Sequence, residues 1–386
     1  MNPLTTLDRL LWVIMAMSVA YIAFYALVYV LFRGKKVKKG HTFTEKESFL
    51  VLIPAYSEDN VIIHTVENFL LQDYPADKYD VVVISDHQKR ATNEHLCSLP
   101  ITVLRPKFIR SSKAKALQFA MTATRKCYDK VVILDADNIV NTDFLSCLNN
   151  LASCGYKAVQ CHRRAKNADS SVSVLDGVSE EINNTLFRKA HNLIGLSSAL
   201  IGSGMCFDFK WFKDNVDKLS TAGEDRELEV LLLTESIFIK YEENIFVYDE
   251  KVNNAENFQR QRQRWMSAQV NCLLAMLPLM PRAILHFNIT FIDKTIQQML
   301  IPRSMLLVGI IMMTVITSTV NVGHSVKWWI LLVVTCLSLF LAIPTDMRKK
   351  SLLAKSGMFL KLAVKMMRNI RHIDRRNEEF IHTEHK

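Results

Sequence analysis

Three long apolar segments constrain this chain of 386 residues more than any other feature. Residues 10–32 run for 23 positions without a charge, residues 304–323 for 20, and residues 328–345 for 18. Each is long enough to cross, as a helix, a hydrocarbon layer about 30 Å thick. A cleaved signal peptide is the alternative for the first segment, but that segment is longer than a usual signal core, lacks a small-x-small cleavage site and precedes its basic cluster. We therefore expect an N-terminal membrane anchor and two C-terminal spans.

The net charge of +10 lies almost entirely beside these segments. One arginine and four lysines fall within residues 33–39, and residues 346–386 hold 11 Lys and Arg against five Asp and Glu, so the rest of the chain is close to neutral. The composition therefore does not indicate a nucleic-acid partner. Basic flanks stay cytoplasmic under the positive-inside rule, which places the N-terminus outside and residues 33–303 and the C-terminus inside. We expect an integral protein of the plasma or inner membrane.

Between the first and second apolar segments, short apolar runs alternate with helical patterns. We expect helices over residues 60–71 and 113–127, and β-strands at residues 48–54, 79–85, 101–104 and 130–134. This alternation predicts βαβ units and a mostly parallel sheet, whose ligands bind beyond the carboxyl ends of the strands. Polar side chains stand just after three of these strands. They are Tyr56, Glu58, Asp86, Asp135 and Asp137.

Two further stretches are predicted to lie along the membrane surface. In residues 276–303 apolar side chains recur at spacings of three and four with few charges, which suits an interfacial helix. Residues 346–386 combine an apolar face with many lysines and arginines, which predicts a basic amphipathic helix. A helix that binds a partner protein would show the same pattern in this tail.

Three polar motifs follow one another in order: Asp-x-Asp at residues 135–137, Gly-Glu-Asp at 223–225 and Gln-x-x-Arg-Trp at 261–265. Each motif alone is weak. In this order, between these apolar segments, the chain resembles a membrane-embedded family 2 glycosyltransferase, the group that includes the synthases of cellulose, chitin, hyaluronan and poly-N-acetylglucosamine. The resemblance covers about residues 45–300. It implies a GT-A domain, a Rossmann-like α/β fold that binds a nucleotide-sugar, over residues 45–275.

The resemblance also implies which residues bind a nucleotide-sugar, with UDP as the expected nucleotide. Tyr56 and Glu58 match the family's Pro-x-Tyr-Asn-Glu loop, with Ser57 in place of Asn. Asp86 stands where the family places an acid against the nucleotide, although Asp-Asp or Asp-Gly-Ser is more usual there. Lys115 fits a position near the diphosphate, and an ordinary exposed helix residue is the alternative.

The Asp-x-Asp motif is the predicted metal site. By the resemblance, Asp137 contacts Mg²⁺ or Mn²⁺ and Asp135 assists at the diphosphate or the donor sugar. Both ions favour oxygen ligands, and a divalent cation neutralises the diphosphate as the glycosyl bond breaks. Two acids in a solvated loop are the alternative.

Glu224 and Asp225 are the predicted catalytic pair. An inverting transfer requires a base that takes the proton of the attacking acceptor hydroxyl. The family motif is Thr-Glu-Asp, in which the last residue is that base, so the match assigns the role to Asp225 although Gly223 replaces Thr. Acids in the first turn of a helix are also favoured by the helix dipole, and both interpretations can hold together.

The acceptor is expected near the remaining motifs. Gly202-Ser203-Gly204 permits a close backbone approach. On a helix, the Gln-x-x-Arg-Trp residues share one side, so Gln261 and Arg264 can hold the leaving diphosphate and Trp265 can stack on an acceptor sugar. A cationic interfacial helix with a tryptophan at the membrane surface is the alternative.

The sequence therefore predicts a hexosyl- or N-acetylhexosaminyltransferase that extends a polysaccharide through β-glycosidic bonds. Three spans are few for a translocation channel, so a homo-oligomer or a partner would be needed. One alternative is a single transfer to a lipid or lipid-linked acceptor. An inactive membrane scaffold that only binds nucleotide is the alternative of another class, and the intact acidic and arginine motifs argue against it.

Overall fold

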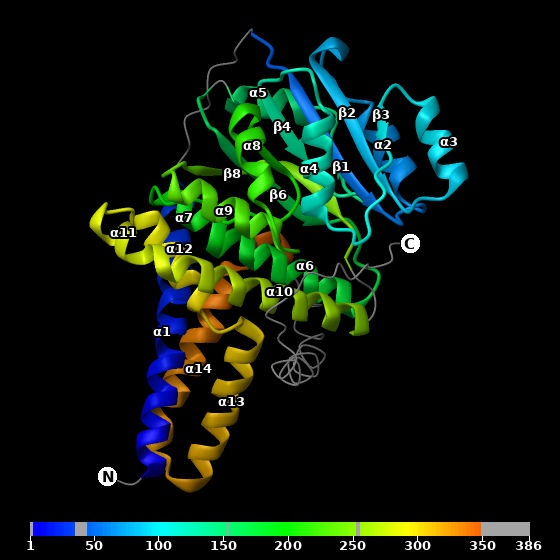
Figure 1. Ribbon diagram of the computed structural model, residues 1–386. Helices are drawn as coiled ribbons and strands as arrows, with labels where there is room; N and C mark the ends of the chain where they lie inside the picture. The colour runs from blue at the N-terminus through cyan, green and yellow to red at the C-terminus, as the bar shows by residue number, and fades with distance from the viewer. Residues whose placement is uncertain (1–2, 35–44, 153, 252–254, 349–386) are drawn as a thin grey trace.

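An α/β domain stands on a bundle of three long helices (Figure 1). The computed structural model describes residues 3–34, 45–152, 154–251 and 255–348. Two predicted stretches therefore lie outside the described residues: most of the basic linker after the first apolar segment, and the basic tail from residue 349 onward.

An eight-stranded mixed sheet forms the centre of the α/β domain, in the order β3-β2-β1-β4-β7-β6-β8-β5. The first four strands in this order are parallel, whereas β7 runs antiparallel to both β4 and β6, and β5 runs antiparallel to β8. The strands are β1 (Phe49–Tyr56), β2 (Tyr79–Asp86), β3 (Thr102–Leu104), β4 (Lys130–Ile133), β5 (Ile139–Val140), β6 (Ala158–Ala165), β7 (Met205–Asp208) and β8 (Ile239–Asp249). The four predicted strands are confirmed. Strands β6 and β8 pair in parallel and run in the same direction as these four, so only β7 and β5 run the opposite way, and the sheet is mostly parallel as expected.

Helices cover both faces of the sheet because successive strand residues point to opposite sides. In β1, Leu50 and Leu52 join one core cluster, and Val51 and Ile53 join another; all four are completely buried. Burial of such a side chain stabilises the fold by about 1.5–3 kcal/mol. The first cluster includes residues of α4 (Lys113–Ala123), α8 (Phe209–Asn215) and α9 (Glu224–Thr234). The second includes residues of α2 (Ile62–Phe69), α3 (Arg90–Ser98) and α5 (Phe144–Ala152).

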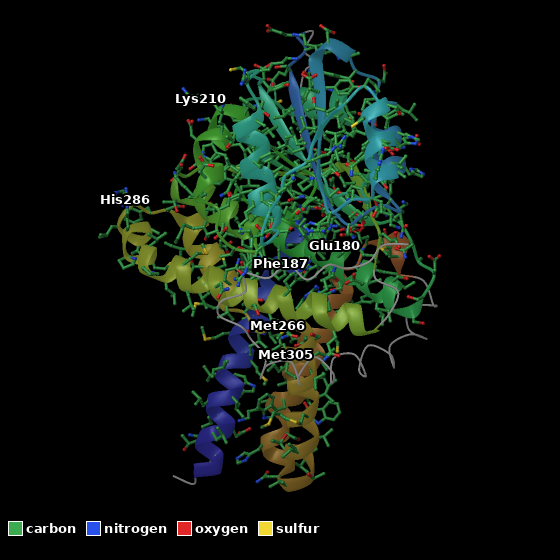
Figure 2. All side chains as sticks on the ribbon, turned by 45° about the vertical axis from the view of Figure 1, so that its right-hand side comes forward. Glu180, Phe187, Lys210, Met266, His286 and Met305 are labelled. Carbon is green, nitrogen blue, oxygen red and sulfur yellow. The ribbon has the colours of Figure 1, made fainter. Side chains whose placement is uncertain are left out.

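A layer of helices lies between the sheet and the bundle (Figure 1). Figure 2 shows the same order: Phe187 lies nearer the sheet, and Met266 and Met305 lie nearer the bundle. The elements of this layer are α6 (Ser171–Asn183), the π-helical turn η2 (Asn184–Lys189), α7 (Ala190–Leu193), α10 (Ala255–Met276), the 3₁₀ turn η4 (Leu277–Leu279), α11 (Met280–Leu285) and α12 (Ile289–Met299).

The interfacial segment is broken, where the sequence predicted one helix over residues 276–303. Phe287 adopts a left-handed conformation with φ of 52°, and the Asn288 side chain accepts a hydrogen bond from the Phe291 amide (3.0 Å), which caps a new helix. Around the break, Leu285, Phe287 and Ile289 are 77%, 85% and 64% exposed. An apolar surface this open suits contact with lipid.

The bundle consists of α1 (Pro3–Phe32), α13 (Arg303–Val320) and α14 (Val322–Ala342). Leu306, Ile310 and Trp328 are completely buried within it. In the described part of the chain, four helical stretches are long and apolar enough to cross a membrane: Thr5–Phe32, Gln261–Leu285, Arg303–Val320 and Val322–Ala342. Three coincide with the predicted segments. The fourth combines α10 with α11 and lies across the end of the bundle, beneath the sheet (Figure 1).

Candidate active site

A cavity of about 720 Å³ opens beyond the carboxyl ends of β1, β2 and β4. It continues past the start of α9 and one side of α10 to the upper ends of the bundle helices. At the sheet, the lining residues include Tyr56, Glu58, Asp86, Asp135 and Asp137. At the bundle they include Ile22, Leu307, Leu339, Phe340 and Ile343. The cavity therefore joins a polar end to an apolar end.

Two sharp turns form the edge of the cavity beyond β1 and β2. Tyr56 and Asp86 are register partners in the parallel pair, and the Ser57 amide donates to the Asp86 carbonyl (3.0 Å). Ser57 and His87 both adopt left-handed backbone conformations, with φ of 53° and 58°. Such conformations cost about 1 kcal/mol or more in non-glycine residues and cluster at functional sites. The strand ends therefore hold Tyr56 and Asp86 together at the cavity, as the sequence predicted.

Hydrogen bonds fix the Asp-x-Asp turn. Asp137 is 5% exposed; its carboxylate accepts from the Glu250 amide (2.8 Å) and from the Asn138 side chain (3.1 Å). The Asn138 side-chain oxygen in turn accepts from the Asp135 amide (2.9 Å). The described residues contain no group of three or more His, Cys, Asp or Glu side chains that could hold a metal. The two aspartates offer hard oxygen ligands that suit a divalent cation, whose other ligands would come from substrate or water.

Lys113 connects the Asp-x-Asp turn to α9. Its Nζ contacts the Asp135 carboxylate, donates to the Gly202 carbonyl (2.6 Å) and lies 3.4 Å from Glu224 Oε1. Burial favours the neutral amine, but Asp135 and Glu224 raise the pKa of Lys113, so the lysine is charged. Burial raises the pKa of Glu224 to about 7; Lys113 opposes this shift and Asp225 adds to it. Glu224 therefore changes its protonation near neutral pH.

The predicted diphosphate lysine, Lys115, lies outside the cavity. Its exposed side chain donates to the Arg110 carbonyl (2.9 Å). The Ser112 side chain caps α4 by accepting from the Lys115 amide (3.2 Å), which makes Lys113 the first helical residue. Lys113 lines the cavity instead. The cap signal of Ser112 marks where α4 starts, but the sequence does not show which of the two lysines turns toward the acids.

Glu224 and Asp225 are the first two residues of α9. The pair therefore lies at a helix N-terminus and at the cavity together. Both line the cavity, and the Asp225 carboxylate accepts from the Arg226 amide (2.9 Å). A Cβ atom on Gly223 would lie 3.1 Å from the Ala268 Cβ of α10. This close approach explains why glycine fits where the family usually has threonine.

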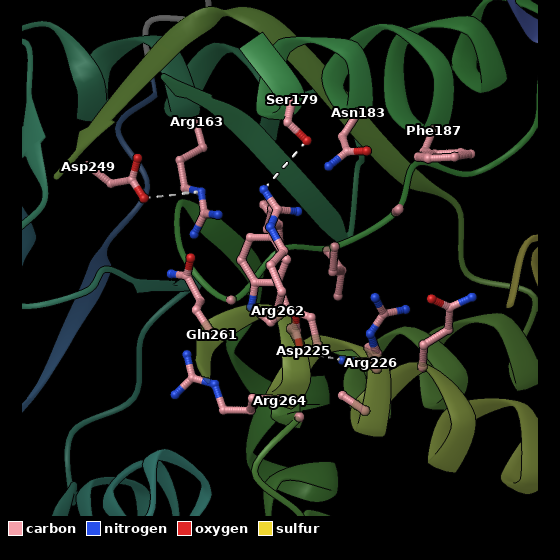
Figure 3. Close-up of a pocket in the computed structure, with 18 of the residues that line it drawn as sticks. Arg163, Ser179, Asn183, Phe187, Asp225, Arg226, Asp249, Gln261, Arg262 and Arg264 are labelled. Carbon is pink, nitrogen blue, oxygen red and sulfur yellow. Dashed lines mark hydrogen bonds and ion pairs between the residues drawn. The ribbon is translucent and has the colours of Figure 1, made fainter. Parts of the chain in front are cut away.

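Gln261, Arg264 and Trp265 of α10 all line the cavity, and Figure 3 shows Gln261 and Arg264 beside Asp225. The guanidinium of Arg262 lies over the Trp265 ring, 4.5 Å from its centroid, and 4.8 Å from that of Phe258. One face of the predicted stacking platform is therefore covered by an arginine.

The Gly-Ser-Gly segment contributes one residue to the cavity rather than three. Gly202, with φ of 60°, lines it. Ser203 is completely buried, and the Gly204 amide donates to the Ile133 carbonyl (2.9 Å) within the sheet. A Cβ on Gly204 would lie 2.9 Å from Val247 Cγ2. Gly204 therefore serves strand packing. The sequence analysis expected Ser203 and Gly204 near the acceptor, but neither residue reaches the cavity.

Several charged residues of the cavity were not predicted, because they are not among the defining residues of the motifs; Arg262 occupies a variable position within one of them. Arg163 and Asp249 form an ion pair (3.5 Å) at the ends of β6 and β8, which Figure 3 shows above Gln261. A group of arginines lines the half of the cavity toward the bundle. They are Arg226, Arg262, Arg303 and Arg348.

The fold is similar to that of solved glycosyltransferases. A mannosyltransferase from Pyrobaculum calidifontis, solved with GDP-Man and Mn²⁺, has a TM-score of 0.59 at 17% identity, covering 94% of this chain and 100% of that chain. Residues 1–349 of TarS from S. aureus give a TM-score of 0.43 at 14% identity, covering 84% of this chain and 90% of that chain. At these identities the likeness concerns the fold alone, and of the two the first supports it.

No curated protein sequence matches the chain significantly. A sequence model of the family described as "Glycosyltransferase like family 2" matches residues 47–268, which is more than half of the chain. The match spans all three polar motifs and every strand of the mixed sheet. The chain therefore belongs to family 2 of the glycosyltransferases, and its α/β domain has the GT-A fold.

Proposed function

We propose that this enzyme transfers one sugar from a nucleotide-sugar to a lipid or lipid-linked acceptor at the membrane, with inversion to a β-linkage. The observation that carries the proposal is the continuity of the cavity, from Asp137 at the sheet to Leu307 and Phe340 on the bundle helices. A water-soluble acceptor has no use for the apolar end. A lipid acceptor would place its chain there and its reacting group beneath α9.

The polar end suits a nucleotide-sugar. Tyr56 and Asp86 would contact the nucleotide, and Asp135 and Asp137 would hold Mg²⁺ or Mn²⁺, which neutralises charge on the diphosphate. The Pyrobaculum calidifontis mannosyltransferase was solved with GDP-Man and Mn²⁺. That complex supports a divalent cation here and makes a GDP-sugar a candidate beside the expected UDP-sugar.

The start of α9 supplies the chemistry that an inverting transfer requires. Asp225 would take the proton of the acceptor hydroxyl as the oxygen attacks the anomeric carbon. Lys113 and Arg264 would balance the charge on the leaving diphosphate. Glu224, held by Lys113 at 3.4 Å, would orient the lysine.

The bundle favours a single transfer over polymer extrusion. Its interior is filled by Leu306, Ile310 and Trp328, which are completely buried, so these three helices do not by themselves surround a channel. Extension of a polysaccharide remains the second candidate, because the Gln-x-x-Arg-Trp motif lines the cavity as that reaction would require. It would need a second copy of the chain or a partner subunit to build a channel.

The proposal includes the predicted membrane topology and domain division. Residues 1–40 would anchor the chain with the N-terminus outside, residues 45–275 would form the cytoplasmic GT-A domain, residues 276–303 would lie in the interface, and residues 304–345 would cross twice before a cytoplasmic tail over 346–386. A cysteine introduced at Lys36 or Lys386 should resist an impermeant thiol reagent in intact cells. Ready labelling of either position would overturn this topology.

A product assay tests the main proposal. Purified enzyme in lipid nanodiscs receives radiolabelled UDP- or GDP-sugars, Mg²⁺ or Mn²⁺, and either membrane lipid extract or soluble oligosaccharides. We expect label in the organic phase, as a product of one added sugar whatever the donor excess. Aqueous product that lengthens with donor supply would reject the single transfer and support polymer synthesis.

A further inference from the structure

We propose that Arg262 and Arg303 bind a phosphate group that joins the acceptor lipid to its polar headgroup. This inference rests on the proposed lipid acceptor and specifies its chemistry: a lipid carrying a phosphate or diphosphate, with the reacting hydroxyl on a sugar beyond it. The two arginines line the part of the cavity between the predicted catalytic acids and the bundle.

The two guanidinium groups converge on one hydroxyl. Arg303 Nη2 donates to Ser179 Oγ (3.1 Å), and Arg262 Nη2 lies 3.5 Å from the same oxygen. The distance between the two nitrogens therefore cannot exceed the sum of these two contact distances, although the nitrogens come from different helices. Figure 3 shows Ser179 and Asn183 of α6 above Arg262 in this part of the cavity. Two guanidinium groups at this separation can share the oxygens of one phosphate.

The charges of this arginine pair are not balanced. Arg262 forms an ion pair with the buried Asp176. Arg303 donates to neutral groups, the Ser179 carbonyl (3.0 Å) and the Asn183 side-chain oxygen (2.8 Å), and within the described residues no carboxylate lies at ion-pair distance from it. A half-buried guanidinium without a counter-ion is costly, so the pair favours an anion.

The position of Arg303 connects this charge to the membrane. Arg303 is the first residue of α13, which follows Pro302 and has no side-chain cap. The positive end of the helix dipole therefore adds to the guanidinium charge. From this point α13 runs into the bundle, and Leu307, one turn further on, lines the apolar end of the cavity. A phosphate held here would leave its lipid chain beside the bundle and its sugar toward Asp225.

The test compares two acceptors with the same sugar and the same lipid chain, joined either by a diphosphate or by a neutral ether. Full-length enzyme in nanodiscs of neutral lipid is assayed for initial rates. We expect a KM at least about ten-fold lower for the diphosphate acceptor, because hydrogen bonds between charged groups are stronger than those to a neutral ether. Equal KM values for the two acceptors would overturn the inference while the lipid-acceptor proposal stands. Failure to transfer to any lipid would instead overturn the proposed function itself.

Two substitutions should move the diphosphate KM in opposite directions. Arg303→Gln should raise it about ten-fold with little change in donor KM, and Arg303→Lys should restore part of the loss. Asp176→Asn removes the carboxylate that competes for Arg262, so it should lower the KM several-fold. The matched control is Arg282→Gln, which removes a charge from the exposed surface of α11 outside the cavity and should change neither acceptor. Equal KM values for wild type, Arg303→Gln and Asp176→Asn would sink the inference.

A binding measurement gives a readout that does not depend on turnover. Polyprenyl phosphate, without a sugar, should bind the wild-type enzyme in nanodiscs about ten-fold more tightly than the uncharged polyprenol, and the difference should disappear in Arg303→Gln. If Arg303→Gln does not fold, Arg303→Lys should reduce the preference for the phosphate over the alcohol, and Asp176→Asn should increase it. Equal binding of phosphate and alcohol by the wild type would contradict the site.

Discussion

The two ends of the cavity are built in different ways. At the sheet, the polar side chains stand on turns that directly follow strands, and the hydrogen bonds that fix Asp137 reach Asn138 beside it and Glu250 after β8. At the bundle, the arginine pair meets at Ser179, which is 83 residues from Arg262 and 124 from Arg303 in sequence. The sheet end is therefore built on turns that follow strands, whereas the bundle end is assembled where α6, α10 and α13 pack against one another. We expect the first to set the chemistry and the second to set the acceptor.

The largest effect should come from the predicted base at the polar end. Asp225→Asn should lower kcat by about 10²–10⁴-fold, the range for loss of a general base, while nucleotide affinity changes little because the volume is conserved. Single-turnover rates and titration with the nucleoside diphosphate measure the two quantities. A variant that keeps more than about a tenth of wild-type kcat would refute this assignment and shift attention to a phosphate oxygen as the nucleophile, which carries no proton to remove.

Removal of the metal should test the same end of the cavity without altering the other. Chelation should stop turnover, and Asp137→Ala should weaken nucleoside diphosphate binding about ten- to hundred-fold in the presence of Mn²⁺, because the cation would bridge carboxylate and diphosphate. Binding of polyprenyl phosphate should stay unchanged. The metal assignment fails if calorimetric titration gives the same nucleotide affinity with Mn²⁺, with chelator and in Asp137→Ala.

Two neighbouring lysines provide a matched pair for the donor position. Lys113→Ala should lower kcat/KM for the donor about ten- to hundred-fold, because it removes the cation that contacts Asp135 and lies 3.4 Å from Glu224. Lys115→Ala should stay within about two-fold, since its exposed side chain contacts the Arg110 carbonyl outside the cavity. A larger loss at Lys115 than at Lys113 would show that the donor binds on the other side of α4.

The smallest expected effect concerns pH and stability. The pKa of Glu224 is raised from 4.5 to about 7 by burial, so between these values the folded state holds a proton that the unfolded state has lost. Stability therefore falls as pH rises through this window, and the cost is complete above about pH 7. Glu224→Gln removes this destabilisation. The Tm of the variant minus the Tm of the wild type should therefore be about 5 °C larger at pH 8 than at pH 5, at roughly 2–4 °C per kcal/mol.

The control for this measurement is an acid outside the cavity. Glu94→Gln, on the exposed surface of α3, should shift Tm equally at both pH values. Thermal unfolding followed by tryptophan fluorescence is sufficient to compare the variants. If Glu224→Gln has the same relative Tm at pH 5 and pH 8, Glu224 is not a buried acid that titrates near neutrality.

Half of the sheet was readable from the sequence and half was not. The strands β1, β2, β3 and β4 are short apolar runs, and buried parallel strands have this composition. Strand β6 contains charged residues, among them Arg163, which conceal it. Those charges are tolerated because Arg163 pairs with Glu180 (3.2 Å) and with Asp249 (3.5 Å) once α6 and β8 are in place. Partners this far apart in sequence leave no local pattern.

The sequence by itself determined the apolar helices, the strands β1 to β4, the order of the polar motifs and hence the family, because each depends on neighbouring residues and on local periodicity. Only the tertiary structure decided that Lys113 and not Lys115 meets the acids, that Gly202 alone of its segment reaches the cavity, and that Arg262 and Arg303 converge on Ser179. These outcomes depend on how separate helices pack against the sheet and the bundle. Packing is set by side-chain shape over long sequence distances, which no short motif encodes.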